Sequence, residues 1–188
     1  FIAYNRSWNI PTLSSVACDH KNGGEMVAEY FIKNNHQKIG LIEGPKGSFV
    51  SDQRIKGFKQ FLKNNKRIKI FNEKGFFTYD GGYQSCQKIL KNKGVSAIFC
   101  ADDTMAFGCL DYIKKNTKIK IPKDLELIGY DDISMSNWKS YDLTTVKQPI
   151  RQMSKLVTQL IDDYIRDPDY ETINHIVRGS LIKRKTTR

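Results

Sequence analysis

Short apolar runs alternate with amphipathic segments along almost the whole chain. Extended segments are predicted where apolar and β-branched residues come together, at 1–5, 13–19, 38–44, within 68–77, and at 97–102, 125–131, 143–149 and 174–184. Helices are predicted where apolar residues recur every three or four positions, at 22–35, 51–65, 81–93, 104–113 and 150–164. This alternation of strand and helix indicates an α/β fold, with a parallel sheet covered by helices on both faces.

The chain is 188 residues long, which is enough for one large domain or one and a half smaller ones. No run approaches the roughly 18 apolar residues of a membrane span, so we expect neither a transmembrane helix nor a membrane partner. The beginning, FIAYNRSWNIP, has neither a basic leader nor a cleavage site, so no signal peptide is expected. It also lacks an initiator Met, so we expect a piece of a longer polypeptide.

The four cysteines are spread singly, with no C-x-x-C pair; they are Cys18, Cys86, Cys100 and Cys109. Two of them, Cys100 and Cys109, lie in apolar runs, where a free cysteine behaves as a small hydrophobic residue. The three histidines are equally dispersed, so the spacing typical of a metal site is absent from the sequence. We expect reduced, structural thiols in a cytoplasmic protein, in preference to disulfides or metal ligands.

The net charge of +11 comes largely from lysine-rich helix ends and loops, such as KNNKRIK at 63–69 and the ending KRKTTR. The simpler interpretation is a solvated surface rich in lysine, asparagine and isoleucine. The alternative is a field that attracts polyanionic partners, of which DNA is the obvious candidate. No DNA-reading motif accompanies the charge, so the sequence favours the simpler interpretation.

Two of the predicted strands end on a pair of aspartates, in CADDTMAFG and in LIGYDDISM. In an open parallel sheet, ligands bind beyond the carboxyl ends of the strands, so both pairs are well placed for a site. Asp103 directly precedes the helical run that begins near Thr104, where an aspartate caps the helix and interacts well with its dipole. We therefore expect Asp103 to be the cap and Asp102 to face the crevice. Asp131 is expected to face the crevice in the same way, with Asp132 holding the loop that follows.

Four carboxylates at strand ends are compatible with three kinds of chemistry. A polyhydroxylated ligand needs carboxylates or amides that accept its hydroxyl hydrogen bonds, and an aromatic face that Phe76, Phe77 and Tyr79 could supply. A Mg²⁺ site needs several oxygens converging on one ion, but no glycine-rich phosphate loop accompanies the aspartates. A carboxylate pair for glycoside hydrolysis fits the residue types alone. We rank ligand binding first, a metal-dependent enzyme second and a glycosidase third, and we assign no catalytic residue, metal or cofactor.

Six segments, in order and at compatible spacing, resemble one known family. They are VACDHKNGG at 16–24, RIKGF at 54–58, AIFCADDTMAFG at 97–108, IPKDLELIGYDD at 121–132, LTTVKQP at 143–149 and LIKRKTT at 181–187. Together they resemble the LacI/GalR family of bacterial transcriptional regulators almost from end to end. That family has an N-terminal helix-turn-helix headpiece, a hinge helix, and a two-lobed core resembling periplasmic sugar-binding proteins.

The resemblance implies a periplasmic-binding-protein-like type I fold, in which two doubly wound parallel-sheet lobes are joined by crossing strands. The first lobe would be incomplete in this chain. The residues of the first and second lobes would be, respectively, 1–20 with 150–174, and 21–148 with 175–188. The crossings between the lobes would lie near 19–21, 148–150 and 174–176.

The matching motifs also imply which residues contact the ligand. Arg54, which opens R-x-x-G-F, would direct its planar guanidinium to a ligand hydroxyl, carboxylate or phosphate, and Phe77 would be the stacking aromatic. Asp102 stands where the family usually has Asn, a departure that favours a ligand offering hydrogen-bond donors. Asp131 would accept hydrogen bonds from sugar or base hydroxyls and amines. From the residues alone, Arg54 also fits a surface position paired with a nearby carboxylate, and Phe77 fits the core.

Two further contacts are implied near the crossings between the lobes. Asn5, fourteen residues before Asp19, matches a polar contact of the first lobe that is often Asp in the family. Gln148 lies at a crossing, where it would belong to the hinge or contact the ligand. Trp8 and Trp138 are expected to anchor packing or loops, with Trp138 a candidate for the rim of the cleft.

The resemblance implies the effector-binding and dimerisation core of a sugar-responsive, DNA-binding regulator, most simply a repressor. A small effector, a sugar or sugar phosphate, would bind between the lobes, and the homodimer would transmit the change to headpieces on operator DNA. The predicted helix at 22–35 would contribute to the dimer. A stand-alone periplasmic-type sugar-binding protein is the alternative, and a metal-dependent enzyme that uses the aspartates is a further one. Within the family, regulation by a protein corepressor stays open.

Overall fold

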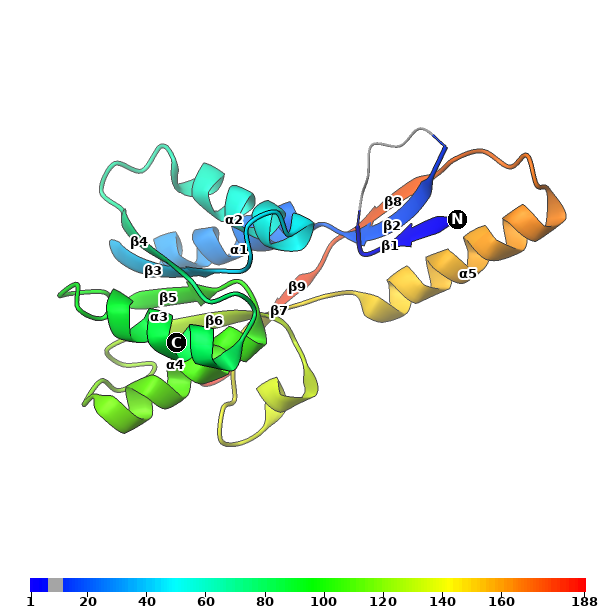
Figure 1. The fold of residues 1–188 in the computed structure, drawn as a ribbon. Coiled ribbons are helices and arrows are strands. Elements are labelled where there is room, and N and C mark those ends of the chain that lie inside the picture. Colours follow the sequence, from blue (N-terminus) through cyan, green and yellow to red (C-terminus); the bar gives the residue numbers. More distant parts are fainter. Residues whose placement is uncertain (7–11) are drawn as a thin grey trace.

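Residues 1–6 and 12–188, which the computed structural model describes, form two sheets, one large and one small (Figure 1). The anchoring role expected for Trp8 lies outside the described residues. Each sheet carries its own helices, and the described chain passes between the two sheets three times. The α/β class predicted from the sequence is confirmed.

The large sheet has the strand order β4-β3-β5-β6-β7-β9. Its strands are β4 (Lys69–Lys74), β3 (Lys38–Glu43), β5 (Ala97–Cys100), β6 (Glu126–Asp131), β7 (Thr144–Lys147) and β9 (Ser180–Ile182). Neighbouring strands are parallel, except that β9 runs antiparallel to β7. The central strands β3, β5 and β6 are buried along almost their whole length, as expected for parallel strands that are covered on both faces.

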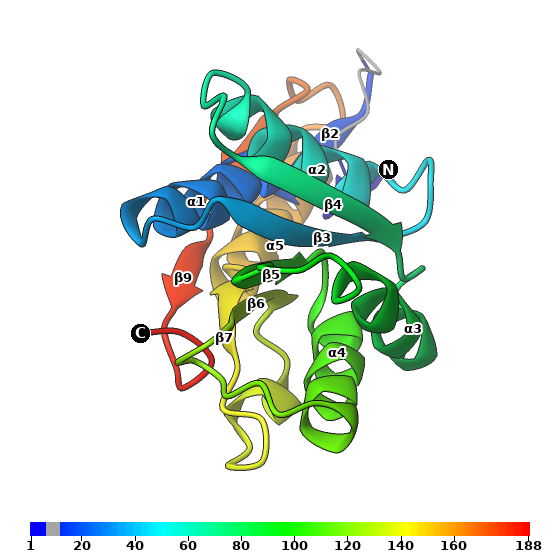
Figure 2. The ribbon, with the colours of Figure 1, turned by 90° about the vertical axis from the view of Figure 1, so that its left-hand side faces the viewer.

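Two pairs of helices cover opposite faces of the large sheet (Figure 2). On one face α1 (His20–Lys33) packs against α2 (Phe49–Leu62), and on the other α3 (Tyr79–Ile89) packs against α4 (Asp103–Asn116). The apolar sides of these helices and the strands between them form the main core. A short 3-10 helix, η1 (Ser134–Asn137), follows β6.

The close approach of α1 and α2 depends on two glycines. A Cβ atom added at Gly24 would overlap the carbonyl oxygen of Arg54, and one added at Gly57 would overlap that of Lys21. Because neither glycine has a side chain, the two helices approach until their backbones touch. This contact fixes the position of α2, and with it the position of Arg54.

The small sheet is parallel, with the order β1-β2-β8 and one helix, α5, packed on it. These elements are β1 (Ile2–Tyr4), β2 (Ser14–Cys18), β8 (Asn174–Val177) and α5 (Ile150–Arg166). The buried residues between them form a second core, consisting of Val16, Cys18, Met153, Leu160 and Val177. Two apolar residues of α5, Ile161 and Ile165, stay exposed. The small sheet therefore has the smaller core.

The segment predicted as one strand at 174–184 is two strands in different sheets. β8 pairs with β2 in the small sheet, whereas β9 pairs with β7 in the large sheet. Val177 accordingly packs in the second core and Leu181 packs against the main core. The chain therefore crosses between the sheets at 178–179, and the crossing expected at 174–176 is corrected. The division into two lobes stays a proposal, with its last boundary moved to 178.

The structure also bears on the expectations for cysteines, tryptophans and membrane contact. All four cysteines are buried and free, as expected for structural thiols. Trp138 follows η1 and is 55% exposed, so it does not anchor the core. Over the described residues, no helix combines the length and the apolar character that a bilayer crossing requires.

Candidate functional site

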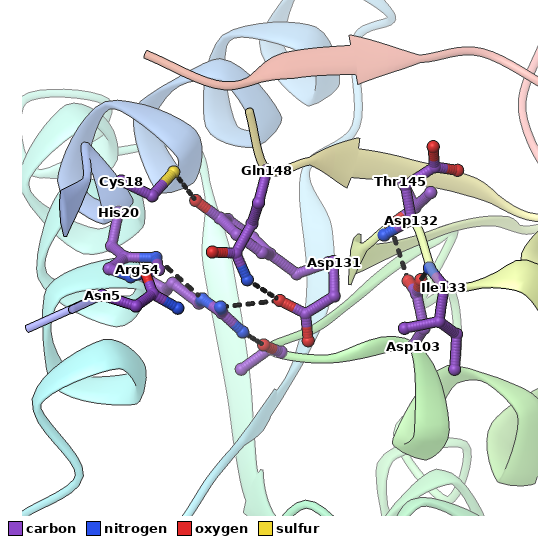
Figure 3. A network of polar contacts seen from close by, with 12 residues as sticks. Asn5, Cys18, His20, Arg54, Asp103, Asp131, Asp132, Ile133, Thr145 and Gln148 are labelled. Carbon is purple, nitrogen blue, oxygen red and sulfur yellow. Dashed lines mark hydrogen bonds and ion pairs between the residues drawn. The ribbon is translucent and has the colours of Figure 1, made fainter. Parts of the chain in front are cut away.

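A hydrogen-bonded network of polar side chains lies where the strands of the large sheet end (Figure 3). Asp131 is the last residue of β6, Gln148 directly follows β7, and Arg54 reaches the same point from α2. Asn5 and His20 extend the network to the end of the small sheet. The network therefore joins both sheets at the carboxyl ends of their parallel strands, which is the edge where open α/β sheets bind ligands.

Arg54 is the centre of this network and is almost completely buried, with 2% of its surface exposed. Its Nη2 donates to Oδ1 of Asp131 at 2.7 Å, its Nη1 to the carbonyl oxygen of Ala101 at 2.6 Å, and its Nε to Nδ1 of His20 at 3.4 Å. The guanidinium carbon also lies 3.7 Å from the centre of the Tyr130 ring. These partners compensate a charge that would be costly to bury alone. The alternative of a surface position for Arg54 is wrong.

The carboxylate of Asp131 accepts hydrogen bonds from one charged donor and one neutral donor. Its Oδ1 accepts the hydrogen bond from Arg54 and another from Nε2 of Gln148 at 2.6 Å. The backbone φ is 117° at Asp131 and 54° at Asp132, a region that side-chain-bearing residues rarely adopt. Strained backbone of this kind is concentrated at functional sites. The strain therefore marks this strand end as a candidate site independently of the residue types.

His20 connects the two sheets within the network. Its Nδ1 accepts from Arg54, so its Nε2 carries the proton and donates to Oδ1 of Asn5 at 3.1 Å. Only 2% of His20 is exposed, and its ring centre lies 5.9 Å from that of Tyr130. Burial, and then the charge of Arg54, lower the pKa of His20 to about 3. His20 is therefore a neutral link at physiological pH.

The two carboxylates expected to face the crevice are harder to ionise than free aspartate. Burial raises the pKa of Asp131, and the charge of Arg54 and the hydrogen bond from Gln148 act against this. Burial also raises the pKa of Asp102 to about 6; the N–H of Met105 opposes this shift, and the charge of Asp131 adds to it. The negative charge of Asp131 therefore makes Asp102 harder to ionise.

Of the two aspartates that follow β5, Asp102 and not Asp103 caps α4. Asp102 is the cap of α4, because its backbone is extended and its Oδ1 accepts from the N–H of Met105 at 2.8 Å. Asp103 is the first residue of α4 and is only 1% exposed. The cap expected at Asp103 is thus wrong by one residue, since β5 already ends at Cys100 and leaves Asp102 extended. Asp102 is 8% exposed, and its contact with a ligand stays a prediction.

Asp103 secures the loop that follows β6. Its Oδ2 accepts from the backbone N–H of Ile133 at 3.0 Å and from Oγ of Ser136 at 2.7 Å. Its Oδ1 accepts from Oγ1 of Thr145 at 2.6 Å. Burial raises the pKa of Asp103 to about 7, against the effect of these three donors. The carboxylate thus holds the loop and β7 in place from the interior.

Asp132 has partners in the strand region and not in the loop. Its Oδ1 accepts from Nη2 of Arg184 at 2.7 Å, and its Oδ2 lies 3.4 Å from Nζ of Lys147. The loop-holding role expected for Asp132 is therefore wrong, because its side chain turns toward β7 and the C-terminal segment. The backbone of Asp132 has a positive φ of 54°.

Phe77 lies apart from the hydrogen-bonded network. Its ring is partly buried against the main core and covers Gly44, where an added Cβ would overlap the ring atoms. Phe76 and Phe77 have φ values of 57° and 60°, so the turn between β4 and α3 holds two aromatic residues in a rare conformation. Part of the Phe77 ring therefore packs against the core, which was the alternative interpretation of the sequence. Stacking of Phe77 on a ligand stays a prediction.

The comparison with family models decides which family this arrangement represents. Residues 28–187 match the periplasmic binding protein-like domain. The chain belongs to the periplasmic binding protein-like family. The two-sheet architecture and the position of the network between the sheets agree with the fold implied by the sequence motifs.

The relatives of this periplasmic binding protein-like chain are transcriptional regulators. It is 31% identical over 195 residues to the probable HTH-type transcriptional repressor ExuR of Bacillus subtilis, covering 99% of this chain and 58% of that protein. It is 31% identical over 168 residues to the ribose operon repressor of Haemophilus influenzae, covering 87% of this chain and 50% of that protein. The chain thus spans between 50% and 58% of the length of these curated relatives.

A solved structure extends the likeness to the LacI family. The crystal structure of a LacI family transcriptional regulator from Enterococcus faecalis with bound ribose matches with a TM-score of 0.87 at 27% identity. The match covers 100% of this chain and 68% of that chain. The resemblance to the LacI/GalR family is confirmed, and the periplasmic binding protein-like chain corresponds to the effector-binding portion of such regulators.

Sequence reasoning missed two members of the network, His20 and Tyr130. His20 follows a predicted strand directly after Asp19, so the strand-end rule that selected the aspartates applies to it equally. Tyr130 is completely buried beneath the guanidinium of Arg54. The signal was a tyrosine in a predicted buried strand, because the hydroxyl of a buried tyrosine usually needs a polar neighbour.

The aspartates do not converge in this periplasmic binding protein-like domain. Among the described residues, no group of three or more His, Cys, Asp or Glu side chains is arranged to hold a metal ion. Asp102 is turned to a helix N-terminus, Asp103 to the interior, Asp131 to Arg54 and Asp132 to Arg184. The arrangement offers oriented hydrogen-bonding groups at the junction of two sheets, which is suited to holding the hydroxyl groups of a small ligand.

Proposed function

We propose that this domain is the effector-binding and dimerisation core of a sugar-responsive transcriptional repressor that acts in the cytoplasm and is not an enzyme. The observation that carries the proposal is the continuous network from Asn5 through His20 and Arg54 to Asp131 and Gln148. A ligand that contacts both ends of this network would favour one arrangement of the two lobes. Such a preference is what an effector needs in order to change the affinity for operator DNA.

The proposed ligand contacts combine the network with two residues beside it. Asp131 and Gln148 would orient the hydroxyl groups, Arg54 would hold Asp131 in place, and Asn5 would supply the contact from the first lobe. The full set proposed is Asn5, Arg54, Phe77, Asp102, Asp131 and Gln148. Phe77 would stack on the ligand and Asp102 would accept a further hydrogen bond.

The relatives support a regulator over a stand-alone periplasmic-type sugar-binding protein. One relative is a repressor of a ribose operon, and one structural neighbour is a LacI family regulator with ribose bound. Operator DNA would be bound through another part of the longer polypeptide, in a homodimer. A protein corepressor acting on the same core is the variant of this function that the basic surface keeps open.

Titration of the full-length protein with D-ribose and a panel of other sugars, by calorimetry and by operator mobility shift, tests the function. Asp131→Asn keeps an oxygen for Arg54 but removes the charge, and we expect it to weaken effector binding roughly 10- to 100-fold. Asp131→Ala should abolish effector binding while the fold remains intact. Asp169→Asn, in the exposed loop after α5, is the matched control and should bind as the wild type does.

Two results would contradict the proposal at different points. Unchanged effector titrations for both Asp131 variants would show that the site lies elsewhere. A sugar that binds tightly without changing operator affinity would support the stand-alone binding protein in place of the regulator.

A further inference from the structure

We propose that the junction of the two sheets selects uncharged sugars and discriminates against sugars that carry a phosphate or a carboxylate group. This rests on the proposed function, because it concerns the ligand of the same network. It narrows the expected effector from a sugar or sugar phosphate to a free polyhydroxylated sugar.

The guanidinium of Arg54, at the centre of the network, already donates hydrogen bonds to protein partners. Arg54 donates to Asp131, to Ala101 and to His20, each from a different guanidinium nitrogen. One face of the guanidinium is covered by the Tyr130 ring, and its side chain is only 3% exposed. An anion anchor needs a guanidinium edge with two free N–H groups, as in a bidentate pair. Because three of its five N–H groups are used and its side chain is almost completely buried, Arg54 is poorly placed to receive a phosphate or carboxylate.

The atoms of the network that still lack a hydrogen-bond partner are acceptors. Nε2 of Gln148 donates to Asp131, and an ionised carboxylate cannot donate in return, so the direction of the amide is fixed. Its Oε1 is buried and has no hydrogen-bond partner among the described residues. Within the same residues, Oδ2 of Asp131 accepts no hydrogen bond, and this side chain is 25% exposed. Sugar hydroxyls can donate to both oxygens, and an unpaired buried acceptor favours a ligand that does so.

The charge at the junction favours the same class of ligand. Asp131 is paired with Arg54, Asp102 is a second carboxylate near them, and His20 is neutral, so carboxylates outnumber cations in the network. A phosphate or carboxylate on the ligand adds negative charge to a region that is largely buried, where like charges repel strongly. An uncharged sugar adds none.

The opposite preference, for an anionic sugar, would depend on Arg6 of the first lobe. Arg6 follows Asn5 at the end of β1 and is exposed. If the site took an anionic sugar, Arg6 would be the guanidinium available to hold it. Arg6→Gln therefore tests the competing outcome directly.

Calorimetry of the full-length protein at pH 7.5 with matched ligand pairs tests the proposal. The pairs are D-ribose with D-ribose 5-phosphate, D-glucose with D-glucose 6-phosphate, and D-galactose with D-galacturonate. We expect the uncharged member of any pair that binds to bind at least ~10-fold more tightly than its charged partner, since one like charge costs about this much. Arg6→Gln should leave this preference unchanged.

Different results would contradict the selection of uncharged sugars and the proposed function. A charged sugar that binds as tightly as its uncharged partner, or more tightly, overturns the selection while the proposed function stands. Loss of that binding in Arg6→Gln would assign it to the first lobe. Absence of binding by every sugar, in protein that is folded and binds DNA, overturns the proposed function and the selection together.

Asp102→Asn separates charge repulsion from shape. Asparagine keeps an oxygen that caps α4 and removes one negative charge. We expect the preference for the uncharged member of a pair to narrow at least ~3-fold, whatever happens to the absolute affinities. Asp80→Asn, exposed on α3, is the control and should not change the preference. A preference that is identical in wild type and Asp102→Asn would overturn the electrostatic basis of the selection.

Discussion

The adjacent aspartates Asp102 and Asp103, which follow β5, have different roles. Asp102 caps α4, whereas Asp103 ties the loop after β6 to the interior through Ile133, Ser136 and Thr145. A buried carboxylate with three donors is costly to remove, because each donor is left without a partner. The position of the loop that follows Asp131 therefore depends on a residue that no ligand is expected to touch.

Asp103→Ala should lower the free energy of unfolding by about 2–4 kcal/mol, since it leaves buried donors unpaired. Urea denaturation followed by circular dichroism measures the change. Asp124→Ala, at an exposed position in the turn before β6, should change stability by less than about 1 kcal/mol. Equal effects of the two substitutions would show that Asp103 does not hold the loop.

The same carboxylate predicts a specific dependence of stability on pH. The pKa of Asp103 is raised to about 7 in the folded protein, above the ordinary value of 3.8, so folding favours its protonated form. Its stabilising contribution is therefore full below about pH 4 and is lost as the pH rises through 7. The difference in unfolding free energy between wild type and Asp103→Asn should fall over this window, by at most about 1.4 kcal/mol per pH unit. A difference that grows with pH would mean that the three donors outweigh burial.

At the scale of elements, the contact between α1 and α2 sets the geometry of the site. Gly57→Ala places a Cβ against the carbonyl oxygen of Lys21, so the helices must separate and Arg54 must move with α2. We expect a loss of about 1–3 kcal/mol in unfolding free energy and weaker effector binding. Gln60→Ala, on the exposed side of the same helix, is the control for both measurements. Full effector affinity in Gly57→Ala would show that the position of Arg54 does not depend on this contact.

The order and type of the elements could be predicted from the sequence, because apolar spacing changes clearly between strand and helix. Their ends could not. The helix predicted at 22–35 begins at His20, since Asp19 accepts the N–H of Asn22 and caps it there. The strand predicted at 174–184 divides, because periodicity shows that a segment is extended but not which sheet it joins.

The site shows a similar limit. The family motifs brought Arg54, Asp131 and Gln148 to one place, and the structure joins them by hydrogen bonds. The directions of Asp102 and Asp103 were not accessible, because a shift of one residue at the end of β5 exchanges which carboxylate is extended and which is helical. Side-chain direction depends on that boundary, which sequence patterns locate only to within a few residues.

For the whole molecule, His20 links Asn5, at the end of the small sheet, to Arg54 beside the large sheet. His20→Phe keeps an aromatic ring beside Tyr130 but removes the hydrogen bonds to Arg54 and Asn5. We expect the ratio of operator affinities with and without effector to shrink several-fold, since coupling between sites is typically worth 5- to 150-fold. Mobility shifts of the full-length protein measure this ratio, and circular dichroism checks that the variant is folded. An unaltered ratio would mean that the lobes are coupled by another route.

The path of the chain also limits how the two sheets can move relative to each other. Cys18 pairs with Val177 on one side of the junction and Lys147 pairs with Ser180 on the other, so the three crossings lie side by side (Figure 1). Three adjacent backbone segments prevent free rotation and leave a bend about the line of the crossings as the easiest motion. Different ligands would then differ in how far they move the lobes along one path and not in its direction. We therefore expect related sugars to give graded responses of the same kind, with weak effectors producing a partial version of the full change.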